Sequence, residues 1–350
     1  MTLPEKSCLV TSVILFMMIS FTSESKAQAF KANRGDKTNS YKPYKYAKFT
    51  EDVKRYPAAT PPDGSVNKHG EIEYLEGNCF ATHWFVQPDD AVWHFVTAGD
   101  PNSKETILFV HGYPETWHAF YKQMAALSKD HYVIAVDQLG YGQSDKNLSR
   151  DYAYSVTAAS LKNLLDELTL NQFYLVSHDR GTIISENLIA LEGMNKRVKS
   201  WVRMQQAFDQ PHGYPRPPHE QMATVEFQSA DRLIQNFYKS NYVSVELPED
   251  EIDRLAWEFG FKGTPEAAAL TFNTSFDSEL DFRMKNVIPK LTMPVLLVQG
   301  VLDPGQHAEE YMNSAALLPN GQVKFIDTNH FMHLEATDLV TEIIQDFFFK

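Results

Sequence analysis

Short apolar runs alternate with segments of helical spacing along most of the chain. Runs that predict strands buried in a sheet lie at residues 106–110, 132–136, 173–176, 198–204, 294–298 and 323–326. Segments that predict helices lie at 120–127, 154–169, 181–191 and 339–349. Strand and helix in alternation are typical of an α/β fold, here a doubly wound, mostly parallel twisted sheet flanked by helices.

The pattern changes before and within this core. Residues 71–86 and 91–98 predict two further strands. From 209 to 286 a proline-rich loop is followed by helical patterns without a strand candidate. We therefore predict a core formed by 71–208 and 287–350, with 209–286 inserted as a helical cap.

Residues 1–29 have the features of a secretory signal peptide. Lys6 supplies positive charge, residues 8–21 are largely apolar, and Ala27-Gln28-Ala29 has the form of a cleavage site. A membrane anchor is the competing interpretation, but the stretch is shorter than the roughly 20 residues that span a bilayer. We expect cleavage near Ala29 and an exported protein, periplasmic or secreted, without a stable membrane anchor. Cys79 would then be its one cysteine, which excludes an internal disulfide.

The next segment, 30–70, is rich in Tyr, Pro and Lys and lacks clear periodicity, which predicts an extended or partly disordered arm. The chain as a whole is 43% apolar and 22% charged, an ordinary globular composition. Its net charge of −13 argues against nucleic acid or an anionic membrane as partner. A small-molecule partner fits this balance, and the oligomeric state stays open.

Residues 173–181 form the most informative motif. An apolar strand is followed by Ser177, then Asp179, then Gly181, which is the small-x-nucleophile-x-small spacing of a nucleophile elbow. The spacing has a steric reason, because bulky side chains on either side would collide with the backbone of the tight strand-to-helix turn. Ser177 as nucleophile would be flanked by Leu175 and Asp179, which does not fit. An ordinary strand end with a solvated aspartate is the alternative.

Two more residues complete a possible triad. Asp303 follows the strand predicted at 294–298, and His330 follows the strand predicted at 323–326. Nucleophile, acid and base in this order, each beyond a predicted strand, favour one site at the carboxyl edge of the sheet. Each residue by itself could equally be an ordinary loop residue.

These motifs resemble the α/β-hydrolase fold, in the branch of epoxide hydrolases, haloalkane dehalogenases and haloacetate dehalogenases. The resemblance covers about 71–349; residues 111–117 are similar to that branch's HGxPETW segment and 139–146 to its GYGxSDK segment. It implies Asp179 as nucleophile, His330 as the base that activates water, and Asp303 as the carboxylate that orients it. It implies an oxyanion hole from the backbone N–H groups of Tyr113 and Arg180, and no metal or organic cofactor. His333 is the less favoured base.

The leaving group is less clear, because the chain departs from each subfamily. Haloalkane dehalogenases place Asn and Trp where Tyr113 and Arg180 stand. Haloacetate dehalogenases share the His-Asp-Arg-Gly of residues 178–181 and bind a carboxylate through that arginine, but Ile183 replaces their second arginine. Epoxide hydrolases place a cap tyrosine where Asn273 stands.

We expect substrate contacts from residues around the predicted nucleophile and from the cap: Trp117, Arg180, Tyr238, Tyr242 and Asn273. Tyr214 and His212 are further candidates for the proton donor. Arg180 could instead pair with a cap acid such as Glu226, and any cap tyrosine could simply pack on a helix. The favoured function is hydrolysis of an epoxide through an aspartyl ester. A haloacetate-type dehalogenase and a non-catalytic ligand-binding protein are the alternatives.

Overall fold

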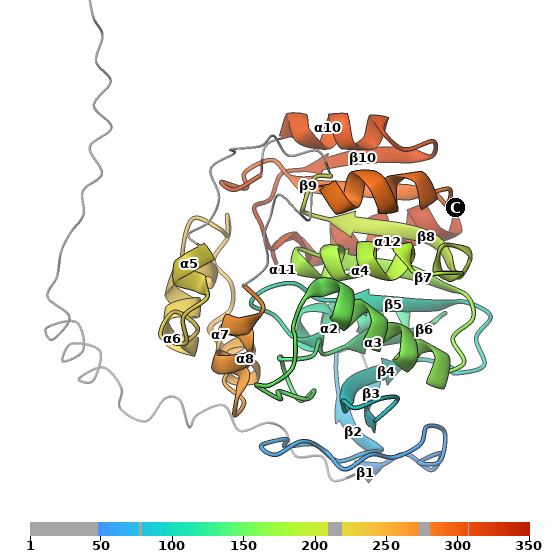
Figure 1. The fold of residues 1–350 in the computed structure, drawn as a ribbon, viewed down its shortest axis with the longest axis vertical. Helices are drawn as coiled ribbons and strands as arrows, with labels where there is room; N and C mark the ends of the chain where they lie inside the picture. The colour runs from blue at the N-terminus through green and yellow to red at the C-terminus, as the bar shows by residue number, and fades with distance from the viewer. Residues whose placement is uncertain (1–47, 77–78, 209–218, 273–280, 307) are drawn as a thin grey trace, which may run out of the picture. The chain divides into compact units, whose positions relative to one another are not determined.

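The computed structural model describes residues 48–76, 79–208, 219–272, 281–306 and 308–350. Within these ranges ten strands form one sheet in the order β1-β2-β3-β4-β6-β5-β7-β8-β9-β10 (Figure 1). The strands are β1 Lys48–Phe49, β2 Glu71–Tyr74, β3 Phe80–Val86, β4 Trp93–Ala98, β5 Thr106–Val110, β6 Tyr132–Val136, β7 Phe173–His178, β8 Val198–Met204, β9 Val295–Gly300 and β10 Gly321–Ile326.

In sheet order, the strands β6, β5, β7, β8, β9 and β10 run parallel to one another. The strands β1 to β4 pair antiparallel, and β4 also pairs antiparallel with β6. The parallel strands β5, β6 and β7 are apolar along most of their length because helices cover both of their faces. The predicted mostly parallel sheet flanked by helices is therefore confirmed.

The core helices are α2 Tyr121–Leu127, α3 Tyr154–Glu167, α4 Arg180–Ala190, α10 Ala308–Ala316, α11 Met332–Glu335 and α12 Thr337–Phe349, with 3-10 turns η2 Trp117–Phe120 and η3 Met194–Lys196. Leucines of α3 and isoleucines of α4 belong to one apolar cluster against the sheet. Side chains of α2 and α12 belong to a second cluster. Each face of the sheet thus has its own core.

Three details differ from the sequence prediction. The segment 71–86 is not one strand but an antiparallel pair, β2 and β3, with a break between them. The helix α10 was not predicted. Residues 48–70 are not a disordered lead-in, because β1 pairs with β2 and Tyr56 is buried in the core, with its hydroxyl 2.9 Å from that of Tyr132. Residues 1–47, and with them the predicted signal peptide and most of the arm, lie outside the described residues.

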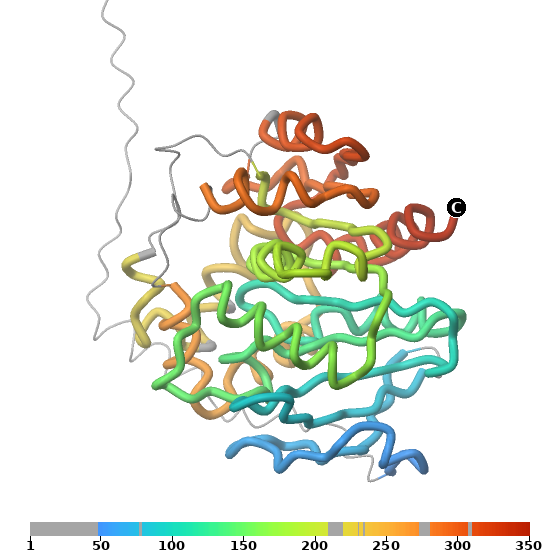
Figure 2. Tube along the Cα trace, turned by 45° about the vertical axis from the view of Figure 1, so that its right-hand side comes forward, coloured from blue at the N-terminus to red at the C-terminus, as the bar shows by residue number. Residues whose placement is uncertain are grey.

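The described part of 209–286 is helical, and the helical segment continues to residue 290. Its elements are α5 His219–Met222, α6 Ala230–Leu233, η4 Ile234–Tyr238, α7 Glu249–Phe259, α8 Thr264–Leu270, η5 Arg283–Val287 and η6 Ile288–Lys290. Figure 1 places α5 to α8 beside the edge at which β5 and β8 end. In the tube of Figure 2 the same yellow and orange segments again lie to one side of the sheet. Across the described ranges, no helix combines the length and apolarity needed to cross a membrane.

Candidate active site

Asp179 lies on a sharp turn between β7 and α4. Its backbone is strained, with φ 47° and ψ −123°, in a region that residues with a Cβ rarely adopt. The neighbouring chain leaves no room for side chains. A Cβ added to Gly181 would lie 2.3 Å from the carbonyl oxygen of His111, and one added to Gly112 would lie 2.5 Å from Cβ of Asp179. The steric reason given for the elbow spacing therefore holds at Gly181.

His330 and Asp303 meet Asp179 at the carboxyl edge of the sheet. Asp303 follows β9, His330 follows β10, and the His330 Nδ1 atom is 2.9 Å from Asp303 Oδ2. The other ring nitrogen, Nε2, lies 3.7 Å from Asp179 Oδ2. The three residues predicted from separate motifs are thus brought into one hydrogen-bonded and ion-paired group.

The two oxygens of the Asp179 carboxylate have different surroundings. Oδ1 accepts the backbone N–H of Tyr113 at 2.9 Å, and the backbone N–H of Arg180 also donates to this carboxylate. Oδ2 faces His330. Burial alone would raise the pKa of Asp179, but the positive charge of His330, that of His178 and the two backbone donors together hold the pKa below its usual value. The group is therefore ionised at neutral pH.

The charges in the site shift the pKa of His330 in the opposite direction to that of Asp179. Burial would lower the pKa of the imidazole, but Asp303, through its charge and its hydrogen bond, and the Asp179 and Glu115 charges raise the pKa to about 9. His330 is therefore protonated while Asp179 is ionised. Loss of the Asp179 charge would remove one of these causes and lower the pKa of His330.

Glu115 is a buried carboxylate that joins three segments of the site. It accepts hydrogen bonds from the Gly112 N–H at 2.9 Å, from His178 Nδ1 at 2.9 Å and from His333 Nε2 at 2.7 Å. Burial would raise the pKa of Glu115, but the two histidines hold it well below its usual range. His178 Nε2 also contacts the His330 carbonyl at 3.0 Å. Both ring nitrogens of His178 therefore face acceptor oxygens, which fixes the orientation of the ring.

Glu115, His178 and His333 also have metal-ligating side chains, with ligand atoms within 4.8 Å of one another. The atoms that face each other are already joined by short hydrogen bonds. The group therefore fits a charged hydrogen-bond network that holds the site together better than a metal centre. It also explains why His333, engaged with Glu115, does not compete with His330 for Asp179.

Two glutamines at the site were not predicted from the sequence. Gln205 and Gln206 follow β8, with positive φ of 63° and 62°. Gln205 Nε2 donates to the His330 carbonyl at 3.3 Å, and Gln206 Nε2 donates to Asp179 Oδ2 at 3.1 Å. The signal that could have found them is their position, since β8 was predicted and its carboxyl end lies at the same edge as the triad.

The cap tyrosines differ in their surroundings. Tyr238 is buried and donates to the Pro114 carbonyl at 2.9 Å, which is a packing role. Tyr242 is half-buried, with its ring centroid 5.6 Å from that of His330. Burial, together with the Asp303 and Asp179 charges, raises its pKa, so the phenol stays protonated. The remaining cap candidates, Asn273, Tyr214 and His212, lie outside the described residues.

The Arg180 side chain connects core and cap. Its Nη1 donates to the Thr271 carbonyl at 2.8 Å, and its guanidinium stacks 3.8 Å from the Phe272 ring centroid. The suggested pairing with Glu226 is wrong, because Glu226 is exposed and pairs with Arg232 at 2.6 Å.

Trp117 is not placed to bind substrate, contrary to the sequence prediction. Its side chain is fully buried in a core cluster, and its ring centroid lies 5.5 Å from that of His83. Its backbone N–H donates to Asp137 Oδ1 at 2.8 Å. A substrate could reach the indole only by opening the core. The family-like Trp is therefore a packing residue here.

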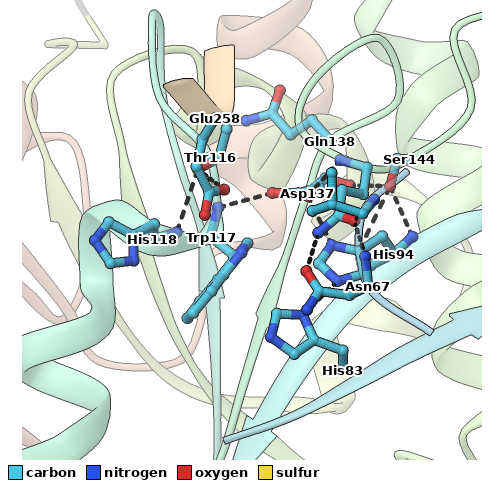
Figure 3. Close-up of polar contacts among 12 residues, drawn as sticks. Asn67, His83, His94, Thr116, Trp117, His118, Asp137, Gln138, Ser144 and Glu258 are labelled. Atoms are coloured by element: carbon cyan, nitrogen blue, oxygen red, sulfur yellow. Dashed lines mark hydrogen bonds and ion pairs between the residues drawn. The ribbon is translucent and has the colours of Figure 1, made fainter. Parts of the chain in front are cut away.

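A further histidine–carboxylate network is buried away from the candidate site (Figure 3). His94 Nδ1 lies 2.7 Å from Asp137 Oδ2, His94 Nε2 lies 3.0 Å from His83 Nδ1, and His83 Nε2 lies 3.0 Å from Glu73 Oε2. Arg254 of the cap helix α7 continues the network, with bonds to Glu73 at 2.6 Å and to Glu258 at 2.7 Å. The network thus ties the cap to the strands of the core.

Comparison with known proteins agrees with this geometry. A family model described as alpha/beta hydrolase fold matches residues 105–337. Epoxide hydrolase 4 of Mus musculus is 33% identical over 114 residues, which is 32% of this chain and 32% of that protein. A haloalkane dehalogenase of Psychrobacter cryohalolentis is 36% identical over 100 residues, 28% of this chain and 32% of that protein. The matched region therefore spans about a third of these relatives.

Among solved structures, the chain is similar to the Cif epoxide hydrolase from Acinetobacter nosocomialis. The TM-score is 0.66 at 24% identity, over 79% of this chain and 90% of that one. At this level of identity the likeness establishes the fold alone.

Proposed function

The chain belongs to the α/β-hydrolase fold family, and we propose that it hydrolyses a small alkylating electrophile, an epoxide, through an ester on Asp179. The observation that carries the proposal is the asymmetry of the Asp179 carboxylate. One oxygen is held by the backbone N–H of Tyr113, while the other faces His330. A carboxylate held in this way is suited to attack a saturated carbon through Oδ2.

In the first step, Oδ2 of Asp179 attacks an epoxide carbon, the carbon–oxygen bond of the ring breaks, and an ester forms. The opening oxygen needs a proton. Tyr242 supports that role best among the described cap residues, because its phenol is protonated and its ring lies beside His330. The role of Tyr242 stays a proposal, as does any contribution from Asn273.

Once Asp179 is neutral as an ester, His330 releases its own proton to solvent. In the second step, the neutral His330 takes a proton from water, and the water oxygen attacks Cγ of the ester. Neutralisation of Asp179 in the ester lowers the pKa of His330 at the stage when a base is needed. The oxyanion then forms on Oδ1, where the N–H groups of Tyr113 and Arg180 stand. Each such donor typically contributes about 3 kcal/mol to transition-state stabilisation.

The engagement of Arg180 favours an epoxide over a halo-carboxylate. A carboxylate clamp needs a guanidinium that can present two N–H groups to the ligand. Here the guanidinium stacks on Phe272 and donates to the Thr271 carbonyl. A substrate carboxylate would have to displace these contacts.

Trapping of the ester tests the proposal. The variant His330→Gln should alkylate Asp179 but fail to hydrolyse the ester, so incubation with epoxides should add the epoxide mass to the peptide that carries Asp179. The double variant Asp179→Asn, His330→Gln is the matched control and should gain no mass there. A library that includes haloacetates separates the leaving groups. Turnover by the wild type without an adduct in His330→Gln would contradict the two-step mechanism.

Export is a separate proposal. It rests on Lys6, the apolar stretch at 8–21 and the cleavage form of Ala27-Gln28-Ala29. N-terminal sequencing of the protein from the extracytoplasmic fraction should give a start near Phe30, and recovery of an intact Met1 chain in the cytoplasm would contradict it.

A further inference from the structure

The backbone after β8 is strained at the point where it passes the candidate nucleophile. The described residues other than glycine with positive φ are Thr169, Asp179, Gln205 and Gln206. Glutamine has no local hydrogen bond that favours this conformation, as Asn and Asp do. Strain of this kind persists where the surrounding structure requires it, and it gathers at functional sites. The turn therefore serves to direct these two side chains.

The hydrogen bond to Asp179 fixes the orientation of the Gln206 carboxamide. Its Nε2 donates to Asp179 Oδ2 at 3.1 Å, and because a carboxylate only accepts, the amide nitrogen must face Asp179. The carbonyl oxygen Oε1 is then left as an acceptor. The side chain is 7% exposed, and Oε1 has no hydrogen-bond partner among the described residues. A buried acceptor without a protein donor leaves a position at which a water molecule can bond.

The candidate base flanks the same oxygen of Asp179. His330 Nε2 lies 3.7 Å from Oδ2 and Gln206 Nε2 lies 3.1 Å from the same atom, so both side chains are adjacent to the oxygen that is bonded to Cγ. We propose that Gln206 is a catalytic residue that positions the hydrolytic water through Oε1. One water proton points to His330 Nε2, the other to Gln206 Oε1, and the lone pair points to Cγ of Asp179. The inference rests on the proposed function.

The step balances without a further reagent. The water oxygen bonds to Cγ, one water proton passes to His330 Nε2, and the carbonyl electron pair moves to Oδ1. Cγ–Oδ2 then breaks, and His330 returns the proton to the departing alkoxide. The second water proton remains on the incoming oxygen, bonded to Gln206 Oε1, and then passes to the phenolate left when Tyr242 protonated the ring oxygen. His330 regains its resting proton from solvent once Asp179 is again ionised. The net reaction is epoxide plus water to diol.

A different role for Gln206 would give different kinetics. If it only orients Oδ2 for attack, its loss slows ester formation and lowers kcat/KM. If it positions water, its loss slows ester hydrolysis, which follows the irreversible first step. The parameters kcat and KM then fall together while kcat/KM changes little.

The test uses the full-length protein and the epoxide that gives an adduct with His330→Gln. In Gln206→Met, of similar length but without polar atoms, kcat should fall about ten- to hundredfold, the range expected when one such hydrogen bond is lost. The parameter kcat/KM should stay within about threefold of wild type. The ester on Asp179 should accumulate during turnover.

Gln123→Met is the matched control, because Gln123 is also buried with an unpartnered Oε1 but has no contact with Asp179. It should leave both parameters near wild type.

A second variant keeps the test decisive if Gln206→Met does not fold. Gln206→Glu retains an acceptor for water but places a second carboxylate beside Asp179, so it should lower kcat/KM without accumulation of ester. Accumulated ester in Gln206→Glu, or a fall in kcat/KM without ester in Gln206→Met, would overturn the inference. So would unchanged kinetics in Gln206→Met. Failure of the proposed function would differ, because His330→Gln itself would then give no adduct.

Discussion

Two buried histidine–carboxylate networks in this molecule differ in how completely their atoms are paired. In the network of Glu73, His83, His94 and Asp137, each ring nitrogen has a partner at 2.7 to 3.0 Å, and both Asp137 oxygens accept backbone N–H groups, from Trp117 and Gln143. In the network of Asp179, His330 and Asp303, the contact between His330 Nε2 and Asp179 is 3.7 Å.

The difference teaches what separates a structural network from a candidate site. Burial and a short His–Asp hydrogen bond are common to both. The second network alone has strained backbone, at Asp179, and a long contact, at His330. It also adjoins Gln206, which has strained backbone and an unpartnered oxygen. A fully paired network is rigid and stabilising, while an incompletely paired one can accept a reactant.

The largest expected effect is on activity, from Asp179→Asn. This substitution removes the proposed nucleophile and should lower kcat/KM by at least about 10⁴-fold. The midpoint of thermal unfolding should stay the same or rise, since a strained, charge-bearing site is relieved. Activity assays and thermal melts on the same sample check both parts. A variant that unfolds would place Asp179 with the structural network instead.

The matching change in the other network, Asp137→Asn, should do the reverse. An amide cannot accept from all three N–H donors around it, so the free energy of unfolding should fall by about 3 kcal/mol. Chemical denaturation measures this loss. Molecules that remain folded should keep most of their kcat, and a loss of kcat without a loss of stability would undo the distinction between the networks.

Stability above neutral pH should report on His330. Its pKa is raised from 6.5 to about 9, so its contribution is complete below pH 6.5 and is lost as the pH rises through 9. The free energy of unfolding should therefore decline by about 3 kcal/mol over this interval. His330→Gln should lack that part of the decline. Equal pH dependence in the two proteins would show that His330 is not held as an imidazolium.

The titration of Glu258 gives a second window, of the same sign and at lower pH. Burial, with the Asp137 and Glu73 charges, raises its pKa to about 7 despite Arg254. Because the pKa is raised, the contribution of Glu258 to the free energy of unfolding is complete below its pKa in the unfolded chain, near 4.5. That contribution is lost as the pH rises through 7. Glu258→Gln should flatten the stability profile between pH 4.5 and 7, as measured by denaturation, while leaving the profile at higher pH unchanged. A profile that keeps its slope would leave Glu258 ionised throughout.

The smallest effect is expected from Arg180→Lys. Lysine keeps the charge but loses the stack on Phe272, so stability should fall by about 1 kcal/mol. Activity on neutral epoxides and on acidic substrates should fall equally. A selective loss on acidic substrates would instead make Arg180 a carboxylate clamp.

The sequence predicted most of the sheet and the three main site residues, because each has a local cause. Buried parallel strands are continuous apolar runs, and the elbow needs small residues beside Asp179. Gln206 was not predicted, because its proposed role depends on a contact with Asp179 from another strand, and only its position after the predicted strand at 198–204 pointed toward the site. Trp117 was misassigned because its motif reports the path of the backbone toward Asp137, not the direction of the indole. The break within 71–86 was missed because both of its halves suit a strand.

The bonds of Glu115 have a consequence for the order in which the molecule folds. They join residues 63 positions apart, to His178, and 218 positions apart, to His333. Contacts between residues far apart in the sequence form late in folding, because other packing must first offset the entropy cost of closing the loop between them. On the proposed chemistry, a molecule with a formed elbow but an undocked α11 could be alkylated at Asp179 and not recover. Substrate present during refolding would then trap molecules, and the mass of the Asp179 peptide after refolding with and without epoxide measures that fraction.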